Sequence, residues 1–487
     1  MTLATDPFGP ADHIEVEVLV IGSGAGGAPT AALLAEAGFT VLVVEEGDWV
    51  EQGSVKPFSL EQMATQYRSG GVTVAIGRPT VAYTEGRCAG GGTEVNSGLY
   101  KRPPHEVLTA WRDDYRIADL HLDEIDRIAD EVERDLSVSR VPGETTAASR
   151  ALARGAEALG WRNGEIPRWM TYPERGDAAS GQRQSMTVTY LPRAVAAGAH
   201  LATGIRVDHL EVVDGTARAA IVERPDGRRG RISFRHVFVC GGAIQTPALL
   251  QRSRIRGRIG ASLAVHPTVK LAARFREPIN VDDDVPVHQV TEFFPYTSFG
   301  GSASQAGLLA LALNDNWREF RSQITDWRRM SVYYAAITSE GRGRVQAVPG
   351  LRDPVVTYRL TRNDRALLGS GLGRLALAML AAGAEAVYPS FRGAPVVKRP
   401  ADVARLEAGF RATRASVMTV HLCSTVPLGE DPSRCGADSF GRVHGTTNVR
   451  VNDASLLPTA PGVNPQATVM AIAIRNVRRF IEETCVA

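Results

Sequence analysis

The chain of 487 residues is longer than one hydrophobic core usually grows, which predicts two domains or one domain with a large insertion. Lys and Arg number 55 against 53 Asp and Glu, so the formal charge of +2 provides no field for nucleic acid, and no apolar run is long enough to cross a bilayer. The five cysteines have neither metal-ligand nor disulfide spacing and the N-terminus has no secretory pattern, so we expect free thiols, no metal site and a cytoplasmic protein with a small-molecule partner.

The first elements expected along the chain form a nucleotide-binding unit. The apolar run 16–22 predicts a buried strand, a helix-forming run closed by Gly38 follows, and a second apolar run ends at Glu45. Glycines before the helix let the backbone approach a pyrophosphate, and Glu45 can accept hydrogen bonds from ribose hydroxyls. The predicted dinucleotide site consists of Gly22, Ser23, Gly24, Ala25, Gly27 and Glu45. The pattern does not distinguish FAD from NAD.

A later glycine-rich stretch, 367–384, does not repeat this unit. The residues before it are polar, its glycines miss the required spacing, and its large apolar side chains recur at helical intervals. We expect one helix whose small residues allow close packing.

Residues 85–103, EGRCAGGGTEVNSGLYKRP, form a second glycine-rich loop that an ordinary nucleotide-binding domain does not need. The segment resembles the signature of the glucose–methanol–choline (GMC) oxidoreductase family, with a glycine at 92 where the family often has Ser. The resemblance implies FAD as cofactor, and implies that it is contacted by Arg87, Gly91, Gly92, Thr93 and Asn96. Val95 stands where some members carry a His bonded to the flavin, so we expect non-covalent FAD.

Three further segments resemble the same family. The expected strand 203–212 would bring the Val207 backbone to the adenine, and 236–255 is similar to the family's second signature. In the block 441–481, the resemblance places four residues beside the flavin: Asp453, Ala454, Pro465 and Gln466. Pro465 and Gln466 open a helix whose N-terminal dipole would stabilise reduced flavin.

The resemblance implies an α/β fold with a Rossmann-like FAD-binding domain and an α+β substrate domain built on an antiparallel sheet. The matching segments cover the two ends and a middle strip of the chain, less than half of it. We therefore assign to the FAD-binding domain residues 1–110, 196–265 and 411–487, and to the substrate-binding domain residues 111–195 and 266–410.

His421 lies in the apolar stretch SVMTVHLCSTVP, 416–427, where a histidine without further context is most simply a buried core residue. The stretch resembles the family segment that carries a catalytic His, with Ser424 in place of a glycine, and Asn464 matches the second catalytic position. The resemblance implies that His421 takes the hydroxyl proton of an alcohol, that Asn464 aligns the alcohol oxygen, and that hydride passes to flavin N5. His266 and His444 also match family positions, and we expect structural roles for them.

The segment 281–337 is expected to decide the substrate. It combines Asp282–Asp284 with the aromatic residues of TEFFPYTSF, which suits a polar, cationic alcohol, although a solvated acidic loop explains the same aspartates. The chain resembles GMC oxidases of aminoglycoside biosynthesis, so an aminosugar primary alcohol in antibiotic biosynthesis is the first hypothesis and a sterol or long-chain alcohol the second. A non-catalytic flavin-binding protein is the alternative of another class. The electron acceptor, O2 or another molecule, stays open.

Overall fold

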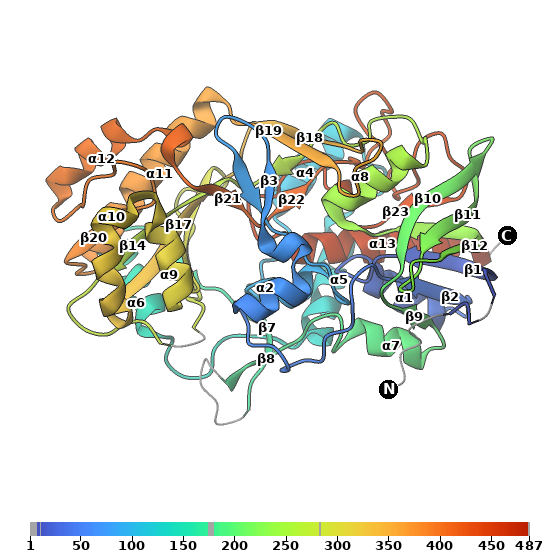
Figure 1. Cartoon of the computed structure of the whole chain (residues 1–487), viewed down its shortest axis with the longest axis horizontal. Helices are drawn as coiled ribbons and strands as arrows, with labels where there is room; N and C mark the ends of the chain where they lie inside the picture. The colour runs from blue at the N-terminus through green and yellow to red at the C-terminus, as the bar shows by residue number, and fades with distance from the viewer. Residues whose placement is uncertain (1–6, 10, 174–179, 282–283, 486–487) are drawn as a thin grey trace.

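The computed structural model describes residues 7–9, 11–173, 180–281 and 284–485. Two large sheets lie toward opposite ends of the long axis, a mixed sheet on the right of Figure 1 and a largely antiparallel sheet on the left. Each sheet has its own hydrophobic core. This architecture confirms the predicted fold class.

The first sheet has the strand order β10-β11-β12-β1-β2-β9, with β23 beside β12. Its strands are β1 His13–Ile21, β2 Val41–Val44, β9 His200–Ala202, β10 Arg206–Val213, β11 Thr216–Glu223, β12 Arg229–Val239 and β23 Val449–Val451. β1 pairs in parallel with β2 and β12, and all four residues of β2 are buried, as expected of a strand covered on both faces. The succession β1–α1–β2 confirms the first unit predicted from the sequence.

Helices cover the first sheet and share its core. They are α1 Gly27–Glu36, α5 Leu122–Asp135, α7 Tyr190–Ala196, α8 Gly242–Arg252 and α13 Gln466–Cys485. In α5 the buried residues Ile125, Ile128, Ala129 and Val132 recur every three or four positions, so one apolar stripe packs against α13. The last helix thus lies between α1 and α5 and begins at Gln466, as predicted.

The second sheet has the order β3-β4-β21-β14-β17-β16-β15-β6, with β20 beside β14. Its strands are β3 Thr73–Ala75, β4 Val81–Tyr83, β6 Asn163–Glu165, β14 Thr268–Arg274, β15 His288–Val290, β16 Thr297–Ser302, β17 Met330–Ile337, β20 Ala386–Pro389 and β21 Val417–Thr419. β4 and β21 pair in parallel, and the other pairs are antiparallel. The sheet confirms the expected antiparallel substrate-side architecture.

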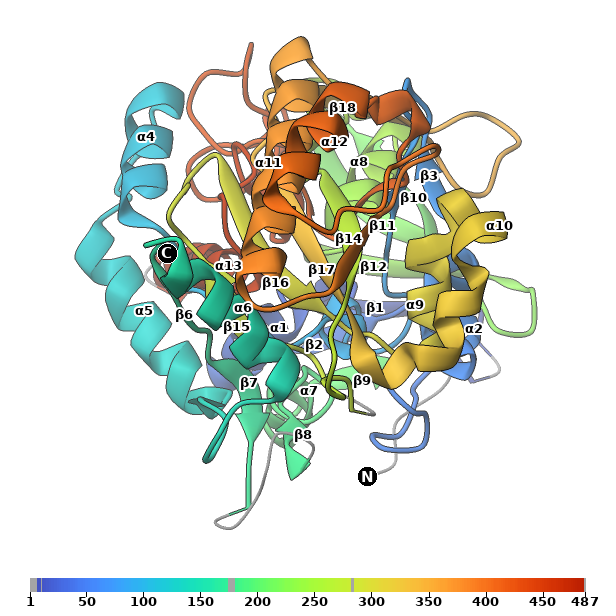
Figure 2. The same ribbon diagram turned by 90° about the vertical axis from the view of Figure 1, so that its left-hand side faces the viewer.

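Helices α6 Ala147–Ala158 and α11 Arg362–Ala381 pack on one face of the second sheet, and α9 Ala306–Leu313 packs on the other. In Figure 2, α6 and α11 lie to the left of α9. α11 begins with a capping box between Thr361 and Asp364. A Cβ at Gly373 would lie 2.0 Å from Glu407 Oε1, and one at Gly371 would lie 3.4 Å from the Ala335 side chain. The close-packed helix predicted over 367–384 is therefore confirmed.

The remaining elements are short or connect the two sheets. The strands are β5 Val138–Ser139, β7 Arg168–Thr171 and β8 Gln182–Arg183, β13 Ala264–Val265 with β22 Leu422–Cys423, and the hairpin β18 Arg342–Gln346 with β19 Val355–Arg359. The helices are α2 Leu60–Gln66, α3 Gly92–Val95, α4 His105–Tyr115, α10 Trp317–Phe320 and α12 Val403–Gly409. Short 3-10 turns are η1 Arg68–Gly71, η3 Asn314–Asn316, η4 Arg321–Arg329, η5 Pro400–Asp402, η6 Ala412–Arg414 and η7 Ala454–Leu456.

The packing departs from the predicted domain ranges in two ways. Strands β3, β4 and β21 fall in ranges assigned to the FAD-binding domain but pair in the second sheet. Helices α5 and α7 fall in a range assigned to the substrate domain, yet their apolar faces pack into the first core. Elsewhere the ranges stay a prediction.

The five cysteines are free thiols, four of them buried. Within the described ranges, no helix combines the length and apolarity that a membrane span requires.

Candidate active site

A cavity of about 1010 Å³ lies where the two sheets meet. The first sheet contributes the loop Gly22–Gly26, and the second contributes residues of β14, β16 and β17. The volume suits a large cofactor together with a small ligand. The lining includes the predicted residues Gly22, Ser23, Gly24, Ala25, Glu45, Gly91, Gly92, Thr93, Asn96, Val207, His421, Asp453, Ala454, Asn464, Pro465 and Gln466.

The loop between β1 and α1 forms one wall of the cavity. Gly22 has φ +102°, and a Cβ there would lie 2.4 Å from the Cys240 carbonyl oxygen, so the position requires glycine. Helix α1 has neither a side-chain cap nor an acidic residue in its first turn, and its dipole therefore favours an anion at this end. The Ala28 and Thr30 N–H groups already donate to Gly24 and Gly26 oxygens, so the Gly27 N–H is the first-turn donor without a hydrogen bond in the structure described. Gly27 does not line the cavity; a Cβ there would lie 1.9 Å from the Gly22 oxygen, so its role is close packing of α1 on the loop.

Glu45 is held beside this loop by hydrogen bonds. Its Oε2 accepts from the Ser23 N–H at 3.0 Å and the Ser23 hydroxyl at 2.7 Å, and its Oε1 accepts from the Gly47 N–H at 2.9 Å. Burial raises the pKa of the carboxyl, and these hydrogen bonds act in the opposite direction. Each oxygen keeps further acceptor capacity, which fits the predicted contact with ribose hydroxyls.

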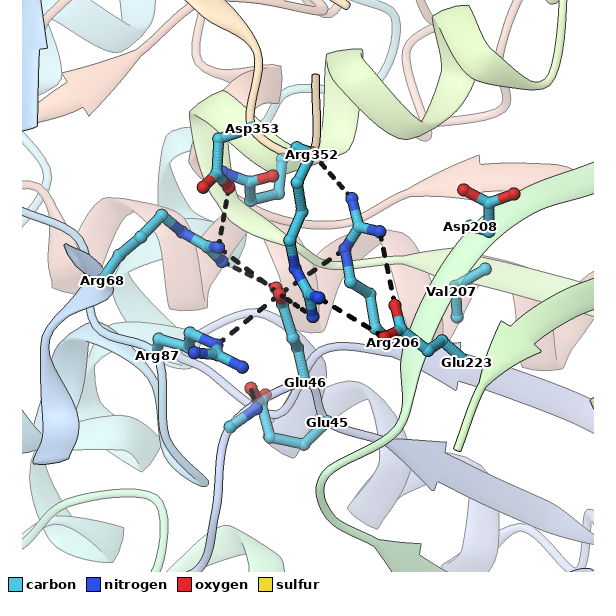
Figure 3. Close-up of polar contacts among 12 residues, drawn as sticks. Glu45, Glu46, Arg68, Arg87, Arg206, Val207, Asp208, Glu223, Arg352 and Asp353 are labelled. Carbon is cyan, nitrogen blue, oxygen red and sulfur yellow. Dashed lines mark hydrogen bonds and ion pairs between the residues drawn. The ribbon is translucent and has the colours of Figure 1, made fainter. Parts of the chain in front are cut away.

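Figure 3 shows four guanidinium groups directed at the neighbouring Glu46. The shortest N–O distances are 2.8 Å to Arg68, 3.5 Å to Arg87 and Arg206, and 3.9 Å to Arg352. Burial opposes ionisation of Glu46, but the arginines, Arg68 first, lower its pKa. Arg87, predicted to contact the cofactor, does not line the cavity, and its side chain belongs to this ion-pair cluster.

The signature loop lies directly against the first glycine loop. A Cβ on Gly91 would lie 3.3 Å from Gly24 Cα, whereas a Cβ on Gly92 would meet nothing within 4 Å. Asn96 Nδ2 donates to Gln466 Oε1 at 2.6 Å, which joins this loop to the first residue of α13 across 370 residues of sequence. Two segments predicted to contact the flavin are thus tied together.

The Asp453 side chain is used within the protein. Its carboxylate accepts hydrogen bonds from the Gly242 N–H at 2.8 Å and from the hydroxyl of Thr246, both on α8, and from the Ser455 N–H at 2.8 Å. A contact of Asp453 with a cofactor must therefore come from its backbone. The uncapped helix, the glycine walls and the acceptor groups of Glu45 together fit a dinucleotide.

His421 forms a pair with His266. Their Nδ1 atoms lie 2.9 Å apart, and His266 Nε2 accepts the Gly462 N–H at 3.0 Å. Neutral His266 therefore carries its proton on Nδ1 and donates it to His421 Nδ1, which leaves the His421 proton on Nε2. His266 is buried in the link between β13 and β14, and its ring lies in direct contact with His421; the structural role expected of it stays a prediction. His444 does take a structural position, with its ring nitrogen 3.0 Å from the Gly429 oxygen.

Both histidines of the pair are held neutral. Burial lowers the pKa of His421 to about 4, because an imidazolium in this cavity loses its hydration. Burial, with His421 as a neighbouring charge, lowers the pKa of His266 well below its ordinary value. At neutral pH the pair carries no charge.

Asn464 is oriented by a residue that sequence reasoning missed. The Nε2 atom of Gln289, on β15, donates to Asn464 Oδ1 at 3.3 Å and to the Tyr334 hydroxyl oxygen at 3.2 Å. With Oδ1 accepting from Gln289, the Asn464 amide nitrogen is available to donate to a ligand oxygen. No local signal points to Gln289, because it reaches the site only through strand pairing in the second sheet.

Ser424, which replaces the family glycine, does not crowd the cavity. It has φ +69°, a conformation that favours glycine, and it is fully buried. Its hydroxyl donates to the Pro458 oxygen at 2.6 Å and it is not among the lining residues. The hydrogen bond offsets the unfavourable backbone conformation.

Two family profiles, both described as GMC oxidoreductase, match residues 63–268 and 339–473. The chain belongs to the GMC oxidoreductase family. It is 40% identical over 474 residues to the uncharacterized GMC-type oxidoreductase y4nJ of Sinorhizobium fredii, a match that covers 95% of this chain and 94% of that protein.

Other relatives of this GMC oxidoreductase carry names that state an activity. It is 26% identical to the long-chain-alcohol oxidase FAO4B of Arabidopsis thaliana, over 95% of this chain and 66% of that protein. It is 25% identical to the 6'''-hydroxyparomomycin C oxidase of Streptomyces lividus, over 97% of this chain and 94% of that protein. Among solved structures, pyridoxine 4-oxidase from Mesorbium loti has the same fold, with a TM-score of 0.72, 19% identity and coverage of 96% and 99%.

Family membership confirms the predicted cofactor, since GMC oxidoreductases bind FAD, and identifies the chain as an oxidoreductase that acts on alcohols. The cavity described above has the size and the anion-binding wall that FAD requires.

Proposed function

We propose that this protein oxidises an alcohol to an aldehyde or ketone with His421 as the proton acceptor and Asn464 as the group that aligns the alcohol oxygen. The observation that supports this most directly is that both side chains line one cavity with the nucleotide-binding loop. The two groups are 43 residues apart in sequence, His421 between β21 and β22 and Asn464 just before α13.

The roles follow from the hydrogen bonds of the two groups. Asn464 can donate from its amide nitrogen to the alcohol oxygen, because Gln289 occupies its Oδ1. His421 is neutral at working pH and accepts the hydroxyl proton as the carbonyl bond forms. FAD, when bound, supplies the acceptor for the hydride that leaves the carbon atom.

The base role requires the histidine pair to exchange tautomers. His421 can accept a proton at Nε2 only if its own proton has moved to Nδ1, which requires His266 to present a lone pair at Nδ1. His266 must then hold its proton on Nε2 and give up the hydrogen bond from Gly462, which leaves two N–H donors facing each other and costs about 1–3 kcal/mol. General-base catalysis typically contributes two to four powers of ten, or about 3–5 kcal/mol, which outweighs that cost.

Two substrate classes stay candidates, each supported by the name of one relative. An aminosugar alcohol, in antibiotic biosynthesis, is supported by the paromomycin-type oxidase, and a long-chain alcohol by FAO4B. The acidic wall expected from 281–337 has no counterpart among the described residues. Asp284 does not line the cavity, and Glu292 pairs with Arg162 at 2.9 Å on the surface. Asp282 and Asp283 lie outside the described residues.

The remaining expectations belong to the same proposal. FAD is held without a covalent bond, as Val95 in place of a histidine implies, and the reaction takes place in the cytoplasm. The first sheet and its helices bind FAD, and the second sheet provides the substrate side. Acid precipitation should release all flavin into solution, and flavin retained by the precipitated chain would contradict non-covalent binding.

Anaerobic bleaching of the flavin absorbance tests the function. The holoenzyme is mixed with sugars, aminosugars, sterols and fatty alcohols, and the reactive class should bleach the flavin. His421→Gln should keep its flavin but bleach at least 100-fold more slowly, while His200→Gln, an exposed control on β9, should be unchanged. Bleaching of His421→Gln at the wild-type rate would refute the base assignment.

The alternative of another class is a flavin-binding protein without catalysis. It predicts a yellow protein that no member of this panel reduces, although dithionite does. The presence of His421 and Asn464 in one cavity favours the enzyme.

A further inference from the structure

Lys270 brings a positive charge to the second-sheet side of the cavity. It is one of only four lysines among the 55 basic residues of the chain. On β14, Val269 and Leu271 are buried in the core, whereas Thr268 and Lys270 both line the cavity. Because neighbouring strand residues point to opposite faces, the Lys270 side chain projects from the sheet into the cavity.

Lys270 stands at one end of a cross-strand row that leads to the catalytic amide. Its direct partner on β17 is Tyr334, followed by Gly300 on β16 and Gln289 on β15. A Cβ on Gly300 would lie 2.4 Å from the Tyr334 hydroxyl oxygen, so the tyrosine lies across the glycine and reaches Gln289. Gln289 in turn contacts Asn464. The lysine and the catalytic amide thus occupy one continuous surface.

The distance along the strand sets the length of the ligand. His266, which touches His421, and Lys270 are four residues apart in nearly extended chain, or about 13 Å between Cα atoms. Thr268 lies between them on the same face. A ligand that reaches both His421 and the Lys270 ammonium must therefore have several atoms between its hydroxyl and its other end.

Within the described chain, no carboxylate pairs with Lys270. The carboxylates that line the cavity are all engaged elsewhere, namely Glu45 with Ser23, Glu46 and Glu85 with Arg68, Asp126 with His105, and Asp453 with α8. None of them comes from the second sheet. Burial lowers the pKa of Lys270 to about 8, since the ammonium loses hydration, yet the charged form still predominates at neutral pH.

We propose that Lys270 binds an anionic group, such as a carboxylate, at the far end of the alcohol whose hydroxyl lies at His421 and Asn464. The inference rests on the proposed function and narrows its substrate class. A partly buried ammonium without a counter-ion is unfavourable, and an anion held in the same cavity offsets that cost with a charge-assisted hydrogen bond. A ligand amine at this position would be repelled.

Binding of unreactive ligands tests the site without any turnover. The holoenzyme is titrated calorimetrically with hexanoate, hexanamide and hexylamine. Hexanoate should bind at least tenfold more tightly than hexanamide, and hexylamine more weakly than either. Lys270→Met should lose the preference for hexanoate, Lys270→Arg should keep part of it, and Lys398→Met, an exposed control, should keep all of it.

Equal affinity of the wild-type protein for hexanoate and hexanamide would overturn the inference, as would an unchanged preference in Lys270→Met. The wild-type comparison decides the matter even where a variant does not fold. Anaerobic bleaching by ω-hydroxycarboxylates of four to ten carbons then separates the two proposals. If hexanoate binds through Lys270 but no alcohol bleaches the flavin, the proposed function is wrong and the anion site stands. If neutral alcohols bleach the flavin and carboxylates are not preferred, the anion site is wrong and the proposed function stands.

Discussion

Acidification should destabilise the protein through His421 in a pH range where an exposed histidine would have no effect. The folded state holds the His421 pKa at about 4, whereas the unfolded chain has the ordinary value of 6.5. Between these values the unfolded chain binds the proton and the folded chain does not, so stability falls as pH falls through 6.5 and levels off below 4. From pH 7 to pH 5 the loss is about 2 kcal/mol.

The assay compares melting temperatures of the wild-type protein and His421→Gln between pH 7 and pH 5. For a chain of this length, about 2 kcal/mol corresponds to a change of about 2 °C in melting temperature. From pH 7 to pH 5, the wild-type melting temperature should therefore fall by about 2 °C more than that of the variant. His266 titrates in both proteins, so it largely cancels in the difference. His200→Gln should follow the wild type. Equal pH dependence of the wild type and His421→Gln would show that His421 is not buried as a neutral group.

Three further changes test the contacts around the site. Glu46→Gln removes the carboxylate shared by four arginines. It should lower the melting temperature measured by calorimetry by about 3 °C and speed the release of FAD on dilution, measured by flavin fluorescence. If both values are unchanged, the cluster does not stabilise the protein. Gln289→Leu leaves the Asn464 amide free to rotate, so the rate of flavin reduction, measured by stopped-flow absorbance, should fall about tenfold while the FAD content stays unchanged. An unaltered rate would show that Gln289 does not position Asn464. His266→Asn can offer an oxygen to His421 Nδ1 and should reduce flavin faster than His266→Ala; the reverse order would argue against the base tautomer.

The nucleotide-binding half of the site could be predicted from the sequence because its requirements are local. A strand, a turn that needs glycine at Gly22 and an uncapped helix follow one another within about 20 residues, and the same pattern rules apply wherever they occur. The glycine-rich stretch 367–384 could be predicted as a helix, not a second nucleotide-binding turn, because this signal is local too: apolar residues recur at helical intervals through its glycines.

The substrate half could not be predicted because it depends on pairing between distant strands. Lys270, Tyr334 and Gln289 meet only through the register of β14, β17, β16 and β15, and a slip of one residue would turn each side chain to the other face. The contact between His266 and His421 spans 155 residues and has no local signature. The expected acidic wall stays a prediction for Asp282 and Asp283, which lie outside the described residues, while Asp284 does not line the cavity.

The hydrogen bond from Asn96 to Gln466 also bears on how the protein is made. A ribosome synthesises the signature loop well before helix α13, with 370 residues between the two partners. Helix α13 supplies both this contact and part of the core over α1 and α5. The nascent chain therefore has no complete flavin site until α13 has been synthesised, so cofactor loading should follow its emergence from the ribosome. A chain truncated before α13 should be made as an apoprotein that proteases can remove.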